Sequence, residues 1–67
     1  MATILLNGEP REIERGVTLA ALLQAANYAQ RRIAVEVNRE IVPKSRHAEH
    51  VLYEGDRIEI VQAMGGG

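Results

Sequence analysis

The strongest strand signal in the sequence is Arg57-Ile58-Glu59-Ile60-Val61-Gln62, where polar and apolar side chains largely alternate and three residues are β-branched. This pattern predicts a strand with one buried face and one face toward solvent. The strand runs directly into Ala63-Met64-Gly65-Gly66-Gly67. Because glycine loses more conformational entropy on ordering than any other residue, we expect residues 64–67 to form a flexible tail. The folded domain is then expected to span residues 1–63.

Length and composition limit what this domain can be. Sixty-seven residues allow one small core, and the absence of Cys, Phe and Trp means that the core is aliphatic and has no disulfide. The net charge of −1 provides no basic face for nucleic acid. No apolar run approaches the ~20 residues of a membrane span. We therefore expect a soluble, cytoplasmic protein that binds neither nucleic acid nor membrane.

The first part of the chain predicts a β-hairpin. Thr3-Ile4-Leu5-Leu6 reads as a strand, Asn7-Gly8 is a strong two-residue turn signal, and Glu9-Pro10-Arg11-Glu12-Ile13-Glu14 forms the return strand. Pro10 has no N–H to donate to a strand ladder, so the return strand is expected at a sheet edge. Alternation leaves Leu5 on the outer face of the first strand.

One helix is predicted after the hairpin. Thr18 is a favourable N-cap, and Asn27 is expected to close the helix, which otherwise frays out by Gln30. Between them, apolar residues recur at the i, i+3, i+4 and i+7 positions of a single buried stripe: Leu19, Leu22, Leu23 and Ala26. This stripe must cover the whole sheet, because no other convincing helix is present.

The second half of the chain predicts more strands. Ile33-Ala34-Val35-Glu36-Val37 alternates, and a turn separates it from a very short Ile41-Val42 strand that Pro43 stops. Residues 44–50 read as a polar loop or one short helical turn. The resulting order, β-β-α-β-β-β, predicts an α+β domain in which a mixed sheet of four to five strands packs on one helix.

No catalytic, metal or nucleotide-binding motif stands out. Neither a Walker A nor a dinucleotide-binding glycine motif occurs, and Ser45 is the single serine. His47 and His50 lie three residues apart, and two histidines without a carboxylate or thiolate partner make a poor metal site. We interpret both histidines as solvated loop residues.

Three features of this sequence carry a family resemblance: the stretch Val35-Glu36-Val37-Asn38-Arg39-Glu40-Ile41-Val42-Pro43-Lys44, the strand Glu54-Gly55-Asp56-Arg57-Ile58-Glu59-Ile60-Val61, and the terminal Gly-Gly. With these features the whole chain resembles ThiS, the ubiquitin-like sulfur carrier proteins of thiamine biosynthesis. The terminal glycine pair is also found in the small subunit of molybdopterin synthase and in ubiquitin-like modifiers, which remain alternatives. The asparagine turn ahead of Ile-Val-Pro and the short length favour ThiS.

The resemblance implies a ubiquitin-like β-grasp fold and a set of partners. A ThiF-type adenylating enzyme would join the Gly67 carboxylate to AMP from ATP, and a sulfur donor such as a cysteine desulfurase would then leave a thiocarboxylate. A thiazole synthase would take up this sulfur. Met64, Gly65 and Gly66 would thread into the partner's active site. The chain itself would be a monomeric co-substrate that binds no cofactor, and not an enzyme.

Outward apolar residues suggest where these partners dock. If the first and last strands are neighbours, as the resemblance implies, Leu5 and Val61 lie near each other on the sheet face away from the helix. Ala34 and Ala63 would extend this surface. Because it would sit beside the tail, we expect it to be a docking surface.

Overall fold

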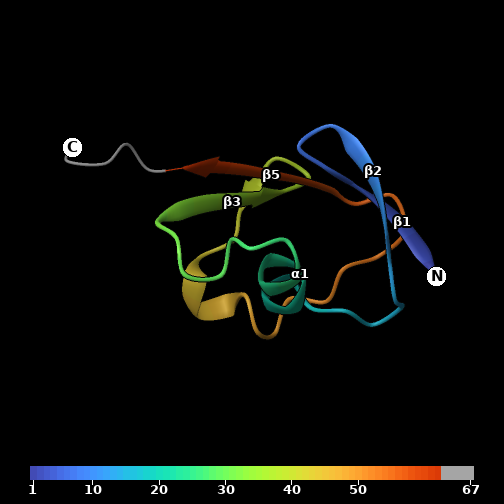
Figure 1. Ribbon diagram of the computed structural model, residues 1–67, viewed down its shortest axis with the longest axis horizontal. Helices are drawn as coiled ribbons and strands as arrows, with labels where there is room; N and C mark the ends of the chain where they lie inside the picture. The colour runs from blue at the N-terminus through green and yellow to red at the C-terminus, as the bar shows by residue number, and fades with distance from the viewer. Residues whose placement is uncertain (63–67) are drawn as a thin grey trace.

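The computed structural model describes residues 1–62, so the predictions for Ala63 to Gly67 lie outside the described residues. Five strands and two short helices follow the predicted order (Figure 1). In chain order they are β1 (Ala2–Leu6), β2 (Glu9–Ile13), α1 (Leu19–Ala25), β3 (Ile33–Val37), β4 (Glu40–Ile41), the 3₁₀ helix η1 (Lys44–Arg46) and β5 (Arg57–Gln62).

The five strands form one mixed sheet in the order β2-β1-β5-β3-β4, and α1 covers one of its faces (Figure 1). β1 and β5 are parallel, whereas the other neighbouring pairs are antiparallel. This arrangement is the ubiquitin-like β-grasp, and it confirms the predicted fold class with five strands. Pro10 lies in β2 at the edge of the sheet, where its missing N–H is tolerated.

Both hairpins turn through two residues with left-handed backbone conformations. These are Asn7 and Gly8 between β1 and β2, with φ of 50° and 85°, and Asn38 and Arg39 between β3 and β4, with φ of 52° and 72°. Positive φ at both central positions defines the type I′ turn, whose twist matches that of the flanking strands. Asparagine tolerates this conformation better than most residues with a side chain, so the two asparagines largely decide where the chain reverses.

Both ends of α1 are capped as the sequence predicts. The Thr18 side chain accepts a hydrogen bond of 3.2 Å from the N–H of Ala21. At the other end Asn27 adopts a φ of 68°, and the Tyr28 N–H donates to the Leu23 carbonyl at 2.7 Å. This is the Schellman arrangement, in which a left-handed residue ends the helix and satisfies its last carbonyls.

The core lies between α1 and the inner face of the sheet, and it is aliphatic. Leu19, Leu22 and Leu23 of the predicted stripe are all buried. They pack with residues from four strands and from the loops, and the full buried set is Ala2, Ile4, Ile13, Leu19, Leu22, Leu23, Val35, Val37, Val42, Leu52 and Ile58. Leu6, Ile33 and Ile60 are half-buried against this cluster, so the inward faces predicted for β1, β3 and β5 are confirmed.

The interpretation of His47 as a solvated loop residue is wrong. Its side chain is only 9 % exposed, and its Nε2 donates to the Val42 carbonyl at 2.9 Å. The backbone carbonyls of His50 and His47 accept hydrogen bonds from the N–H groups of Leu19 and Ala20, at 2.7 and 2.9 Å. The first N–H groups of a helix have no acceptor within the helix, so their hydrogen bonds to these two carbonyls hold the loop against the domain.

Candidate functional site

The candidate site is the end of the domain at which β5 finishes. Gly67, the expected sulfur-carrying residue, lies outside the described residues, as do Met64, Gly65, Gly66 and Ala63. The described structure fixes the strand that leads to them. β5 ends at Gln62 and lies between β1 and β3; β1 pairs with its first two residues, and β3 pairs with it as far as Gln62.

The start of β5 is fastened to β1 through contacts distant in sequence. The Leu5 N–H donates to the Asp56 carbonyl at 2.9 Å, and the Gly55 N–H donates to the Thr3 carbonyl at 2.8 Å. The Thr3 N–H in turn donates to the Glu54 carboxylate at 3.0 Å. The turn before β5 thus sets the register of the parallel pair, in which Leu5 lies level with Arg57.

Asn7 extends this fastening beyond the end of β1. Its backbone N–H donates to the Ile58 carbonyl at 2.9 Å, and its side-chain oxygen accepts from the Ile60 N–H at 2.8 Å. The chain turns into the hairpin at Asn7, so β1 has no further backbone group that could pair with β5. The Asn7 side-chain oxygen accepts a hydrogen bond from β5 at this point instead. The sequence predicted Asn7 as a turn residue but gave no sign of this second role.

The register corrects the expected neighbourhood of Leu5 and Val61. Leu5 is opposite Arg57, and Val61 is opposite Ala34, so all four side chains belong to the outer face. However, Val61 follows Arg57 by four residues, which is about 13 Å along a strand at ~3.3 Å per residue. Leu5 is also half-buried rather than exposed. The two residues share a face but do not form one patch.

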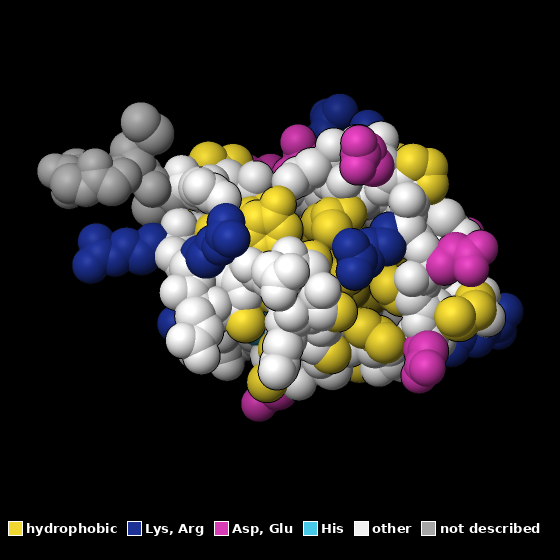
Figure 2. Space-filling view, in the orientation of Figure 1, with side chains coloured by type: hydrophobic (Ala, Val, Ile, Leu, Met, Phe, Trp, Pro, Cys, Tyr) yellow, Lys and Arg dark blue, Asp and Glu magenta, His cyan; other side chains and the backbone are white. Residues whose placement is uncertain are grey.

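The apolar surface beside the end of β5 consists of Val61 and Ala34, which we call the Val61 patch. Val61 is 60 % exposed, and Ala34 is also exposed. Figure 2 shows hydrophobic side chains at the upper margin of the molecule, on the side of the sheet away from α1. The docking role of this patch stays a prediction.

Sequence reasoning missed another outward apolar side chain, that of Ile41, which is 69 % exposed. Ile41 lies opposite Glu36, which lies opposite Glu59, so charged residues separate it from Leu5 and Val61. A signal was available, because Ile41 and Val42 are adjacent and only one of two successive strand residues can face the core. Val42 is the buried one.

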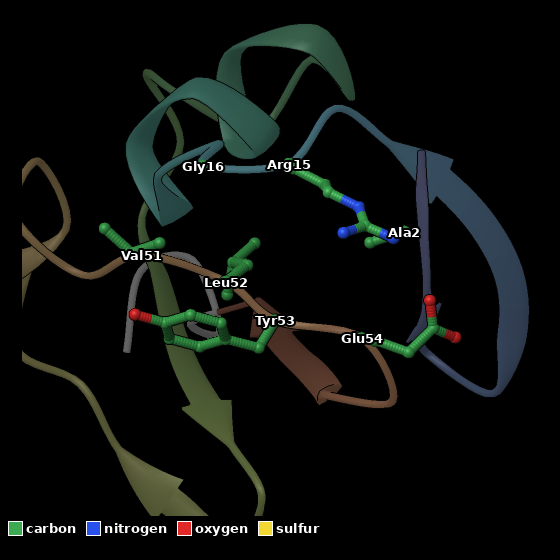
Figure 3. Close-up of a pocket in the computed structure, with 7 residues that line it drawn as sticks. All are labelled: Ala2, Arg15, Gly16, Val51, Leu52, Tyr53 and Glu54. Carbon is green, nitrogen blue, oxygen red and sulfur yellow. The ribbon is translucent and has the colours of Figure 1, made fainter.

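A hollow opens at the opposite end of the domain. Its lining is Ala2, Arg15, Gly16, Val51, Leu52, Tyr53 and Glu54, and the Arg15 side chain extends toward Ala2 (Figure 3). Leu5 lies level with Arg57 in the parallel pair. Ala2 precedes Leu5 by three residues and Gln62 follows Arg57 by five, so the Ala2 side of the hollow lies roughly 26 Å from the end of β5, at ~3.3 Å per residue. The hollow is therefore remote from the end of β5.

The described residues offer neither a metal site nor a membrane-spanning helix. Within residues 1–62, no group of three or more His, Cys, Asp or Glu side chains is placed to hold a metal ion. In the same part of the chain, no helix has the length and apolar character needed to cross a membrane.

Comparison with known sequences decides the family. The sequence model of the ThiS family matches residues 4–67, which include the terminal glycines. This chain belongs to the ThiS family. A sulfur carrier protein ThiS from Escherichia coli is 33 % identical over 64 residues, and the match covers 96 % of this chain and 97 % of that protein. The resemblance stated from the sequence is thereby confirmed.

Two further proteins extend the comparison. A thiazole synthase from Paramagnetospirillum magneticum is 44 % identical over 64 residues, and the chain spans only 20 % of that protein's length. The crystal structure of a thiamine biosynthesis protein (ThiS) from Geobacter metallireducens superposes with a TM-score of 0.84 at 28 % identity, covering 97 % of this chain and 99 % of that one. The β-grasp fold of this ThiS-family chain therefore agrees with an experimental neighbour.

Proposed function

We propose that this chain is a sulfur carrier whose Gly67 carboxylate is adenylated by a partner enzyme and then converted to a thiocarboxylate. The observation that carries the proposal is the family match through residue 67, together with the near-equal length of the Escherichia coli sulfur carrier protein ThiS. The carrier contributes an acyl group on a narrow terminal segment, and its partners contribute the catalysis. The chain is thus a co-substrate rather than an enzyme.

The chemistry of a terminal carboxylate explains the need for activation. An α-carboxyl group has a pKa of about 3.3–3.7, so at neutral pH it is an anion that resists nucleophiles. A ThiF-type enzyme removes this barrier by letting the carboxylate oxygen attack the α-phosphate of ATP, with pyrophosphate leaving. The outer sulfur of a persulfide, carried by a donor such as a cysteine desulfurase, then attacks the acyl carbon and displaces AMP. A thiol reduces the resulting acyl disulfide, which releases the thiocarboxylate and leaves the donor sulfur in a disulfide with that thiol. The chain has no cysteine of its own, so this sulfur comes from outside.

Thiazole formation is the destination that we infer for the sulfur. Support comes from the thiazole synthase of Paramagnetospirillum magneticum, which is more similar to this chain, at 44 % identity, than the Escherichia coli carrier at 33 %. In that relative a segment like this chain forms part of a protein about five times as long. Such an arrangement favours a thiazole synthase over a molybdopterin synthase as the recipient.

The Val61 patch is the docking surface that we propose for the adenylating enzyme. Val61 is 60 % exposed and precedes Gly67 by six residues, which extend over at most about 22 Å at ~3.3–3.6 Å per residue. An enzyme that acts on Gly67 therefore has to cover this end of the sheet. Burying an exposed aliphatic side chain there contributes to binding without any change in the fold.

One experiment tests the proposed function directly. The purified chain is incubated with the adenylating enzyme, ATP and a sulfur source, and its intact mass is measured together with that of its C-terminal peptide. We expect a mass increase of one oxygen-to-sulfur exchange, located at Gly67 and dependent on ATP. Co-purification with a molybdopterin synthase large subunit would instead favour a role as the small subunit of that enzyme. Ladders of higher-mass adducts on a denaturing gel would favour a ubiquitin-like modifier.

A further inference from the structure

The two outer edges of the sheet are protected against pairing with other chains. β2 carries Pro10 together with the charged residues Glu9, Arg11 and Glu12. β4 is only two residues long, and Pro43 follows shortly after it. Prolines, charges and short edge strands are the usual means by which proteins prevent unwanted strand addition.

β5 has an unprotected edge of its own, although it is an inner strand. β1 pairs with it only at Arg57 and Ile58, and β1 then turns away at Asn7. β5 continues to Gln62, well past the tip of the β1–β2 hairpin (Figure 1). Within residues 1–62, no strand pairs with Ile60 to Gln62 on this side. We call these three residues the free edge.

Backbone alternation shows which groups the free edge presents. The carbonyls of Asp56 and Ile58 and the N–H of Ile60 all bond to β1 or to the hairpin turn after it. Groups of every second residue point the same way in a strand, so the N–H and the carbonyl of Gln62 also point to this side. The Ile60 N–H is already satisfied by Asn7. An added strand would meet the Ile60 carbonyl and both backbone groups of Gln62.

The free edge lacks the protection of the outer edges. Ile60, Val61 and Gln62 carry neither charge nor proline, whereas Arg57 and Glu59 earlier in the same strand are charged. The Val61 patch lies on the outer face at the same level. An uncharged edge beside an exposed apolar side chain is suited to strand addition, in which backbone hydrogen bonds provide affinity and side chains provide selectivity.

We propose that the free edge pairs with an extended strand of the thiazole synthase that receives the terminal glycines. This inference rests on the proposed function. Gly67 follows Gln62 by five residues, so a receiving active site lies within about 18 Å of the free edge, at ~3.3–3.6 Å per residue. Pairing at Gln62 fixes the direction in which the following residues leave the sheet, and it thereby aims them at the synthase.

A thiazole synthase suits this edge better than a second copy of the chain. Three residues offer few hydrogen bonds and little area, far below the ~1,000 Å² that a specific interface between two copies requires. Insertion of the terminal residues into a synthase adds the missing contact area. The likeness to a segment within a thiazole synthase indicates that the two partners work at close range.

The test compares two variants at one position. Gln62→Pro removes the N–H that faces the free edge, and Gln62→Ala keeps it while removing the same side chain. Neither change breaks a bond to β3, because the Gln62 N–H points away from that strand. We expect Gln62→Pro to weaken the Kd for the thiazole synthase by about tenfold or more, because an acceptor of the synthase is left unpaired. Gln62→Ala should bind nearly as the parent does.

Amide hydrogen exchange provides a second readout that needs no variant. In the isolated parent chain the Gln62 amide should exchange rapidly, and binding of the synthase should slow it by about tenfold or more. The Ile60 amide serves as the internal control, because it already donates to Asn7 and should change little. An unchanged Gln62 exchange rate in the complex, or equal Kd values for the two variants, would overturn the proposal.

Failure of this inference can be told apart from failure of the proposed function. If the parent chain is thiolated at Gly67 but Gln62→Pro binds the synthase normally, the carrier function stands and the strand pairing is wrong. If the parent is never thiolated, the carrier function fails whatever the exchange data show. A free chain that dimerises, and that Gln62→Pro converts to a monomer, would assign the free edge to a second copy instead.

Discussion

Asn38 and Arg57 are joined by two hydrogen bonds that connect the β3–β4 turn to the first residue of β5. The Asn38 N–H donates to the Arg57 carbonyl at 2.8 Å, and the Arg57 N–H donates to the Asn38 side-chain oxygen at 3.0 Å. The Asn38 amide nitrogen also donates to Asp56 at 3.0 Å. Because Asn38 has a φ of 52°, the same residue both makes the turn and holds the start of β5.

We predict that Asn38→Ala destabilises the domain by about 1–3 kcal/mol, because it removes a side-chain acceptor and donor and places a Cβ-bearing residue without local hydrogen bonds at positive φ. Urea unfolding measures the change. Asn38→Gly is the matched control, since glycine adopts positive φ freely but also lacks the side chain. Alanine should therefore be the less stable of the two variants. Equal stability of both variants and the parent would show that the turn does not depend on this residue.

A second prediction concerns the core. Leu22→Ala in α1 and Ile58→Ala in β5 should each lower the free energy of unfolding by about 2–5 kcal/mol, the usual range for truncating a buried aliphatic side chain. Both side chains are almost completely buried. The control is Val61→Ala in the same strand as Ile58, which should change stability by less than about 0.5 kcal/mol because Val61 faces solvent. Chemical denaturation of all three variants decides the matter.

The sequence predicted the local features of this fold well, because each has a local cause. Asn7-Gly8 marks the first turn through its backbone preferences, and Thr18 marks the start of α1 through its side-chain oxygen. The burial of His47 was missed because it depends on the helix N-terminus against which its loop packs. No pattern within residues 44–50 reveals that contact.

The candidate site shows the same division between local and long-range causes. Alternation placed Leu5 and Val61 on the outer face, which the strand register confirms. Their separation along the face follows from the alignment of β1 with β5. Contacts between residues about 50 positions apart in the sequence set this alignment. Side-chain alternation carries no information about such an alignment. The sequence therefore predicted the face but not the distance along it.

His47 leads to a third prediction. His47→Ala should lower stability by about 1–3 kcal/mol, because it leaves the buried Val42 carbonyl without its donor and opens space in the packed loop. His50→Ala is the matched control, since His50 contributes its backbone carbonyl to α1 and alanine retains that group. Thermal unfolding of the two variants should separate them clearly. A larger loss for His50→Ala would contradict the assignment of His47 as the buried anchor.

The fourth prediction separates the Val61 patch from the rest of the outer face. Val61→Lys should weaken binding to the adenylating enzyme by about tenfold or more, because a charge replaces an apolar contact and has to be desolvated. Leu5→Glu lies about 13 Å farther along the sheet, at ~3.3 Å per residue, and should weaken binding much less. Thermal melting accompanies each Kd, and Val61→Lys should melt close to the parent. Stronger loss of binding in Leu5→Glu than in Val61→Lys, without unfolding, would move the docking surface to the other end of the face.

The last prediction concerns Gly67 and the reach of the residues before it. Deleting Gly66 and Gly67 shortens the extended terminal segment by about 7 Å, at ~3.3–3.6 Å per residue, so the remaining carboxylate cannot reach a reaction centre that tolerates little misplacement. Adding one alanine after Gly67 tests the same idea from the other side, because it moves the carboxylate outward and adds a side chain. Both variants should melt like the parent, since every buried core residue that the structure describes lies within residues 2–58. Neither should acquire the mass of an oxygen-to-sulfur exchange on incubation with the adenylating enzyme, ATP and a sulfur source. Thiolation of the shortened chain at the rate of the parent would show that Gly67 is not the carrier residue, while the β-grasp fold would remain as described.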